Sequence, residues 1–154
     1  MAIETILLAV GPMDTVRADD LADTVLELAE PLGASVVIGH VFTADEYEDF
    51  RDNLGFDERA ESVDPDAVAA RRSPVPDLRA RFEEAGVESE IRGKLDDISD
   101  GVVSMAIEVD ADRIVVGGRR RSPAEKAVLG SVSQGIILQA PCPVTYFRDL
   151  DVME

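Results

Sequence analysis

The sequence predicts an α/β protein built around a parallel sheet. Short runs of β-branched and aliphatic residues alternate with longer segments in which apolar residues recur at helical spacing. The first of these runs, Ile6–Val10, is apolar without a break, which is typical of a strand buried on both faces. With 154 residues and 45% hydrophobic content, the chain suits one domain with one core, and we expect residues 1–154 to form it.

The first half of the chain contains two predicted strands with a helix between them. Ile6–Val10 and Val36–Phe42 are the apolar runs expected of the strands. The segment between them repeats apolar residues at helical spacing, and Gly33 follows it as a C-terminal cap. The repeating residues are Ala18, Leu21, Ala22, Val25, Leu28, Ala29 and Leu32.

An acidic segment interrupts the alternation after the second strand. Asp45 to Asp66 carries ten acidic residues and only two arginines. Connections of this length are usually functional or disordered. We therefore expect an acidic insertion at about residues 43–75 that forms a solvated flap with one helical turn. The alternative is a lid over a ligand crevice.

The second half of the chain continues the alternation. A helix from Pro76 or Asp77 to Ala85 ends at Gly86, and Pro141 stops the last predicted helix, since proline cannot continue one. The other elements are a half-exposed edge strand at Val87–Arg92, a helix marked by Ile98, Val102, Met105, Ala106 and Val109, a strand at Arg113–Gly117, a helix at Ser131–Ala140 and a strand at Val144–Arg148.

The charge balance excludes some classes of partner. The chain has 15 basic and 32 acidic residues, a formal net charge of −17. Such a surface repels nucleic acid and anionic membranes. No apolar run approaches the roughly eighteen residues that a membrane span requires. The N-terminal residues match a first strand rather than a signal peptide, so we expect a cytoplasmic protein.

The basic residues are thirteen arginines and only two lysines, Lys94 and Lys126. An acidic chain with so little lysine indicates a halophilic origin, where molar salt screens the repulsion between carboxylates. The alternative is an acidic protein of a mesophile. We expect the melting temperature to rise from low to molar KCl; a flat response would contradict the halophilic interpretation.

The segment Ile114–Ser133 is the most informative part of the sequence. A β-branched run ends in Gly117, a basic loop follows, and Gly130-Ser131 begins a helical pattern. Phosphate sites of α/β proteins are built in this way, because the N–H groups and dipole of a helix N-terminus favour an anion. The segment resembles the signature of the universal stress protein family: glycine, two residues, glycine, nine residues, glycine, then serine or threonine. Gly117 matches the first position and Gly130-Ser131 the last.

The resemblance extends from Ile6 to Phe147 and implies both a fold and a ligand. The fold is an open five-stranded parallel sheet with helices on both faces and strand order 3-2-1-4-5. The ligand is ATP or AMP, with Mg²⁺ accompanying the phosphates, in a crevice where the strand order reverses. Ala9, Val10, Gly11 and Val41 would hold the adenine, and Val116, Gly117, Arg119, Arg120, Gly130, Ser131, Val132 and Ser133 would line the ribose and phosphate side.

The glycines and serines of the motif also have a purely structural interpretation. Gly117 and Gly130 can adopt positive φ and allow a ligand to approach the backbone. Ser131 could instead serve only as a helix N-cap, and Gly130 only as a turn residue. The preceding strand and the nine-residue spacing favour the binding site.

Two positions depart from the family pattern. Gly11 stands where members that bind ATP usually carry aspartate, and Asp14 could replace it only if the loop folds back. Arg120 stands where the second glycine belongs. With Arg119 and Arg121 it forms the densest basic cluster of the chain, which either binds phosphate bidentately or pairs with the protein's own carboxylates.

Other candidate residues fit structural roles. His40, the only histidine, is expected to pack in or beside the core, because no partnered nucleophile accompanies it. Asp96, Asp97 and Asp100 fit the start of a helix better than a divalent cation, so no metal site is predicted. The single Cys142 fits a small buried hydrophobe and has no internal disulfide partner.

The functional hypothesis is an adenine-nucleotide-binding regulatory or stress-protective module. No catalytic motif occurs, so we expect no enzyme activity beyond slow, incidental ATP hydrolysis. The resemblance implies a homodimer that pairs its fifth strands; the alternative is a terminal strand shielded by Arg148 and the acidic tail. A second functional hypothesis is a homodimeric interaction module of the same family that binds no nucleotide. The residues of the pairing strand are Val144, Thr145, Tyr146 and Phe147.

Overall fold

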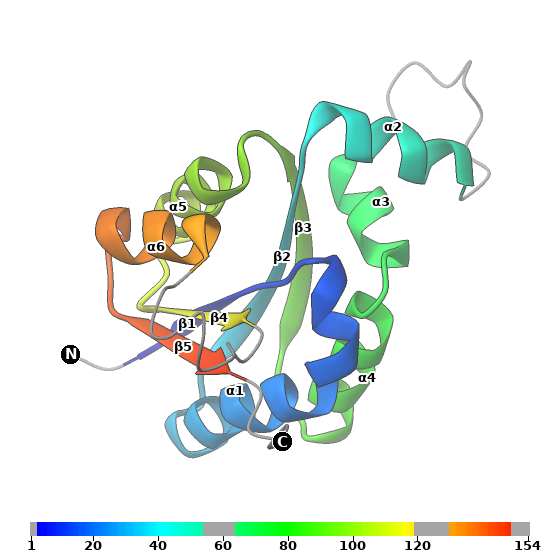
Figure 1. Ribbon diagram of the computed structural model, residues 1–154. Helices are drawn as coiled ribbons and strands as arrows, with labels where there is room; N and C mark the ends of the chain where they lie inside the picture. Colours follow the sequence, from blue (N-terminus) through cyan, green and yellow to red (C-terminus); the bar gives the residue numbers. More distant parts are fainter. Residues whose placement is uncertain (1–2, 54–63, 119–129, 149–154) are drawn as a thin grey trace, which may run out of the picture.

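Five strands form one parallel sheet in the order β3-β2-β1-β4-β5, as predicted. The computed structural model describes residues 3–53, 64–118 and 130–148 (Figure 1). The sheet is open. The chain adds β2 and β3 on one side of β1 and then adds β4 and β5 on the other side, so the strand order reverses between β1 and β4. The strands are β1 (Thr5–Ala9), β2 (Ser35–Phe42), β3 (Ser89–Leu95), β4 (Arg113–Gly118) and β5 (Val144–Arg148).

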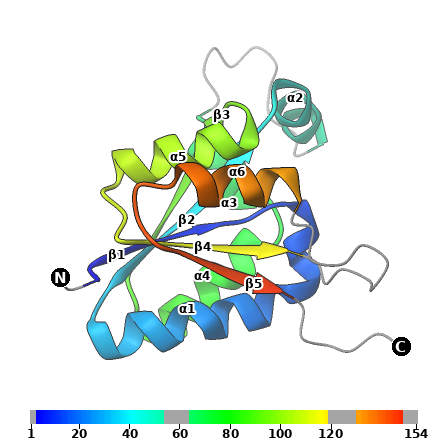
Figure 2. The same ribbon diagram turned by 60° about the vertical axis from the view of Figure 1, so that its left-hand side comes forward.

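Helices cover both faces of the sheet. In Figure 2, α5 and α6 lie above the strands and α1 and α4 below them. The alternation of side chains along each strand produces this arrangement, since neighbours point to opposite faces. On β1, Ile6 and Leu8 belong to the core between the sheet and helices α1 and α4, whereas Leu7 belongs to the core between the sheet and helices α5 and α6. The helices are α1 (Ala18–Leu32), α4 (Val75–Glu84), α5 (Ile98–Glu108) and α6 (Ser131–Gln139).

The helix α1 starts at Ala18, as predicted, but the sequence did not predict the short helix that precedes it. A 3₁₀ helix, η1 (Pro12–Arg17), precedes α1 and turns the chain back over the end of β1. Apolar periodicity could not reveal it, because η1 is six residues long and lacks an apolar repeat. The end of α1 agrees with the prediction: Gly33 adopts φ 66°, and its N–H bonds back to the last turn.

The acidic insertion is more ordered than predicted. Its described ends form two helices, α2 (Ala44–Asn53) and α3 (Pro65–Arg71), so the prediction of a flap with one helical turn is wrong there. Both helices are held by a small apolar cluster of Phe42, Tyr47, Val68 and Ala69. The prediction missed this cluster because its residues are far apart in sequence. Residues 54–63 of the insertion lie outside the described residues.

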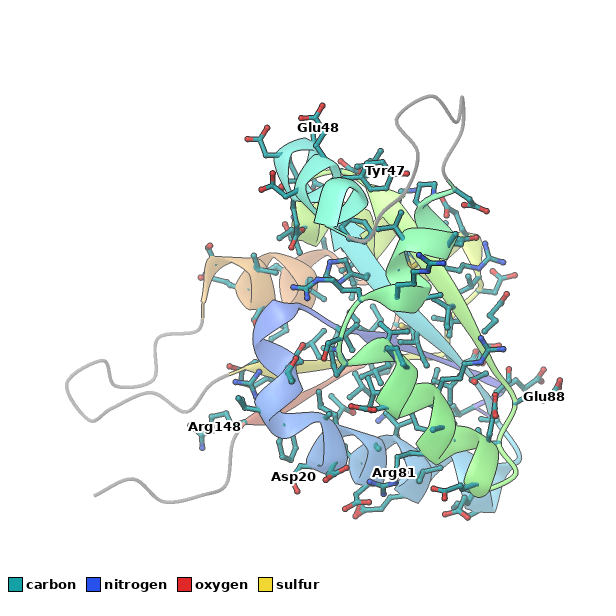
Figure 3. The ribbon with its side chains drawn as sticks, turned by 90° about the vertical axis from the view of Figure 1, so that its right-hand side faces the viewer. Asp20, Tyr47, Glu48, Arg81, Glu88 and Arg148 are labelled. Carbon is teal, nitrogen blue, oxygen red and sulfur yellow. The ribbon has the colours of Figure 1, made fainter. Side chains whose placement is uncertain are left out.

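An exposed ion-pair network joins α4 to α1. Figure 3 shows Arg81 at the junction of these two helices. Its guanidinium lies 3.0 Å from Asp19 and 2.5 Å from Asp23. These carboxylates raise the pKa of Arg81, the Asp23 hydrogen bond most strongly. Because the pairs are open to solvent, they contribute little to stability beside the two cores.

Every helix in the described ranges is too short or too polar to cross a membrane.

Candidate functional site

A crevice of about 260 Å³ opens at the carboxyl ends of β1 and β4. This is the point where the strand order reverses, which is where open α/β sheets bind ligands. Aliphatic side chains from β1, β2, β4, α5 and α6 form most of its surface, and η1 closes one end. The described residues that line it are Ala9, Val10, Gly11, Asp14, Arg17, Val41, Ile98, Val102, Val116, Gly117, Gly118, Val132, Ser133 and Ile136.

The structure brings most of the sequence-predicted site residues to this crevice. Gly130 and Ser131 begin α6 beside it but are not part of its lining. Arg119 and Arg120 lie outside the described residues, so their two proposed roles stay predictions. Eight predicted residues line the crevice: Ala9, Val10, Gly11, Val41, Val116, Gly117, Val132 and Ser133.

A buried ion pair lies at the η1 end of the crevice. Asp14 is 5% exposed and Arg17 is 3% exposed. The Asp14 carboxylate accepts a hydrogen bond from the Gly11 N–H at 2.7 Å through Oδ2 and one from Arg17 Nη1 through Oδ1. The Asp14 N–H in turn donates to the Gly11 carbonyl at 3.1 Å. The loop after β1 therefore folds back on itself, and this fold brings the Asp14 carboxylate to the crevice.

Arg17 was not recognised as a site residue from the sequence. It lies between Val16 and Ala18, directly before a long predicted helix, and belongs to no recognisable motif. The three-residue spacing from Asp14 was the available signal, because i,i+3 pairs lie on one side of a helical turn. Ile98, Val102 and Ile136, which also line the crevice, read in sequence as ordinary core residues.

Gly117 is required because a side chain would not fit at this position, and not because its backbone adopts a positive φ. The only described glycines with positive φ are Gly33 and Gly86, so the prediction of positive φ at Gly117 is wrong. A Cβ on Gly117 would lie 3.0 Å from Asp14 Oδ1 and 3.1 Å from Arg17 Cδ. The bare backbone of β4 thus allows the ion pair to pack directly on the strand.

The N-terminus of α6 faces the crevice with N–H groups and small side chains. Gly130 is the N-cap, with φ −63°, so it does not adopt positive φ, and Ser131 is the first helical residue rather than the cap. Within residues 3–53, 64–118 and 130–148, no side chain caps the helix. Its first N–H groups have no partner within the helix and are therefore suited to an anion. Val132 and Ser133 of this first turn line the crevice.

His40 and Cys142 have structural surroundings, as predicted, whereas the absence of a metal site at Asp96, Asp97 and Asp100 stays a prediction, since their exposed carboxylate oxygens lie within 4.8 Å of one another. His40 is buried on β2. Asp97 is the N-cap residue of α5, and its N–H donates to the exposed Asp96 carboxylate at 2.8 Å; Asp100 lies in the first turn. Cys142 packs partly buried beside the α5–α6 core, and burial raises the pKa of its thiol, which makes the thiol less reactive.

The arrangement supports binding by shape, apolar contact and anion recognition. Ser133 carries the single hydroxyl among the described lining residues. These residues include no histidine or lysine that could act as its general base. The absence of enzyme activity stays a prediction.

These features define a protein with a doubly wound parallel sheet and a crevice at its switch point. The family model of the universal stress protein family matches residues 2–148, and the chain belongs to this family. A universal stress protein of Mycolicibacterium smegmatis is 38% identical over 80 residues, which are 51% of this chain. The match spans only 62% of that relative, less than two thirds of its length.

Solved structures share the fold across nearly the whole chain. A universal stress protein from Archaeoglobus fulgidus, in complex with dAMP, is 21% identical with a TM-score of 0.65, covering 95% of this chain and 98% of that one. A family protein from Arabidopsis thaliana with AMP bound is 19% identical with a TM-score of 0.60, covering 94% and 91%. At these identities the likeness establishes the fold alone.

Proposed function

We propose that the crevice binds an adenine nucleotide, AMP or ATP, and that the protein is a cytoplasmic regulatory or stress-protective module. The observation that carries the proposal is the combination of an aliphatic hollow and a helix N-terminus that no side chain of the described residues caps, both at the switch point of the sheet. The dAMP and AMP complexes of the two structural relatives support it.

The lining fits the two chemical parts of a nucleotide. Val41, Ile98 and Val102 offer apolar contacts for a purine base. The first turn of α6 offers N–H groups to a phosphate. The cavity of about 260 Å³ is near the lower end of small-molecule sites, which favours a monophosphate over a triphosphate within the described walls. When ATP binds, its phosphate oxygens would hold the accompanying Mg²⁺.

The net charge of −17 opposes the binding of any anionic ligand at low salt. Screening weakens this long-range repulsion more than it weakens contacts inside the crevice. We therefore expect the affinity for AMP to increase with KCl concentration, whereas the affinity for uncharged adenosine changes less.

The proposal is tested by melting the protein with AMP or ATP in molar KCl. A nucleotide at about 100 times its Kd stabilises the folded protein by roughly 2.7 kcal/mol, so the melting temperature should rise by several degrees. Ser133→Phe fills the crevice and is expected to abolish this increase. The matched control is Gln134→Phe on the next, exposed residue of α6, which should retain it.

A protein that melts at the same temperature with every nucleotide contradicts the proposal. It would favour the homodimeric module that binds no nucleotide, in which β5 pairs with its copy. One observation favours this second function: the Asp14–Arg17 pair already fills the space above Gly117. Light scattering then has to give the mass of a dimer; a monomer would exclude this second function as well.

A further inference from the structure

The phenol ring of Tyr146 lies against the end of β4, at one wall of the crevice. Tyr146 on β5 is paired in register with Val116 on β4. The atom nearest to a Cβ added at Gly118 would be Tyr146 Oη, followed by Cζ at 2.7 Å and Cε1 at 2.8 Å. Gly118 is a lining residue of the crevice. Tyr146 is not a lining residue itself, but its hydroxyl group lies directly on one.

The glycine at position 118 is what allows this contact. Within residues 3–53, 64–118 and 130–148, the glycines with positive φ are Gly33 and Gly86, so Gly118 is not needed for its backbone conformation. The three atoms nearest to an added Cβ all belong to the phenol of Tyr146. A side chain at position 118 would therefore displace the ring, and the hydroxyl with it, from the crevice wall.

Tyr146 points to the face of the sheet on which α6 borders the crevice. Neighbouring side chains of a strand point to opposite faces, so Tyr146 and Phe147 are separated by the sheet. Phe147 packs against the core beside α1 and α4, whereas Tyr146 packs against the core that contains Val116 and Ile136. Val116 and Ile136 both line the crevice. Figure 2 shows α6 over this face of the sheet, above β4 and β5.

The strand order places Tyr146 at one end of the crevice. β5 lies beyond β4, on the side away from β2. Val41 on β2 belongs to the apolar contacts that suit a base, whereas Gly117 and Gly118 belong to β4. A nucleotide with its base against Val41 would extend toward β4, and its phosphate would approach the hydroxyl of Tyr146.

The hydroxyl of Tyr146 is accessible to a ligand. It makes no hydrogen bond to the described residues, and solvent reaches its oxygen. Arg17 is the one cation among the described lining residues, and Asp14 already engages it. A phenol O–H can donate to a phosphate oxygen, and hydrogen bonds to charged acceptors are about twice as strong as those between neutral groups. A neutral donor is therefore suited to a phosphate at this end of the crevice.

We propose that Tyr146 is a specificity residue of the crevice, whose hydroxyl donates a hydrogen bond to the phosphate of bound AMP. This contact distinguishes the nucleotide from the uncharged nucleoside, which has the same base and ribose but no phosphate. The inference rests on the nucleotide binding proposed above. Because Tyr146 belongs to the edge strand β5, the contact also extends the site beyond the crevice lining.

Tyr146→Phe tests the contact, because it removes the hydroxyl and keeps the ring that packs on Gly118. We expect this variant to lose affinity for AMP by about tenfold, which is about 1.4 kcal/mol of binding free energy. Its affinity for adenosine should change by less than about twofold, since adenosine lacks the group that accepts the bond. Isothermal titration calorimetry in molar KCl measures both dissociation constants for the wild type and the variant.

Tyr47→Phe is the matched control, because the chain has two tyrosines and Tyr47 lies on α2, outside the crevice lining. This variant should bind AMP as the wild type does. It also makes Tyr146 the single tyrosine of a chain without tryptophan, so its fluorescence reports on Tyr146 alone. A phosphate that accepts the phenol hydrogen quenches tyrosine fluorescence. We therefore expect AMP to quench this emission more strongly than adenosine does.

The outcomes separate this inference from the proposed function. A wild-type protein that binds neither AMP nor adenosine overturns the proposed function, and this inference with it. A wild type that binds AMP, with unchanged AMP affinity in Tyr146→Phe, overturns this inference alone. An equal loss of affinity for AMP and adenosine also overturns it, because the lost contact would then not involve the phosphate. If Tyr146→Phe does not fold, equal quenching of Tyr47→Phe by AMP and adenosine overturns it.

Discussion

Replacing Asp14 with alanine should destabilise the protein by about 3 kcal/mol, one of the largest losses expected from a single substitution outside the apolar cores. Asp14 and Arg17 are both more than nine-tenths buried. Removing the carboxylate takes this partner from a buried guanidinium and leaves the Gly11 N–H without its acceptor at 2.7 Å. Urea unfolding in molar KCl measures the loss as a decrease in the midpoint.

The double variant Asp14→Leu with Arg17→Met separates the ion pair from the shape of η1. A buried pair replaced by apolar residues of similar size is often neutral or stabilising, whereas breaking one side is costly. We expect the double variant to recover most of the stability lost in Asp14→Ala. A double variant as unstable as the single one would mean that the hydrogen bond to Gly11 dominates. Asp14→Ala with wild-type stability would contradict the buried pair itself.

Gly93→Ala should produce the second large effect, a loss of about 2–3 kcal/mol. An added Cβ would lie 2.2 Å from the carbonyl oxygen of Pro65 and 2.5 Å from its carbon. These are backbone atoms of α3, so no side-chain rotation can relieve the clash. The helix must move away from β3, and the hydrogen bond from the Gly93 N–H to Asp66 is lost with it.

Gly11→Ala is the matched control for Gly93→Ala. The nearest atom to its Cβ would be Asp14 Oδ2 at 3.9 Å, an ordinary contact. We therefore expect the thermal melting temperature of Gly11→Ala to stay near that of the wild type, and that of Gly93→Ala to fall by several degrees. Equal melting temperatures would show that α3 does not pack on β3 as closely as described.

The Asp14–Arg17 pair lines the η1 end of the crevice. Gly11 follows β1 without a side chain, and Asp14 reaches the same end of the crevice through η1. This carboxylate is already bonded to Gly11 and Arg17. A ligand must therefore bind beside the pair or displace it, and the nucleotide titration of the wild type reports on both cases.

The sequence by itself determined the strands, four of the helices and the position of the crevice. These features depend on local regularities: apolar runs for β1 and β2, helical spacing for α1 and the glycine at its end. The crevice followed from the fold, because the carboxyl ends of β1 and β4 define the switch point once the strand order is known. The family resemblance supplied that order.

Only the tertiary structure decided the electrostatics of the site and of the surroundings of His40. Asp14 turns toward Gly11 because η1 folds back, and η1 leaves no periodic signal. His40 meets Glu46 and Arg72 although 6 and 32 positions separate them in the chain, since α2 and the end of α3 pack over β2. Sequence patterns record which side chains are apolar and how they repeat. The burial and pairing of a charge depend on which distant elements pack against it, and the fold alone determines that.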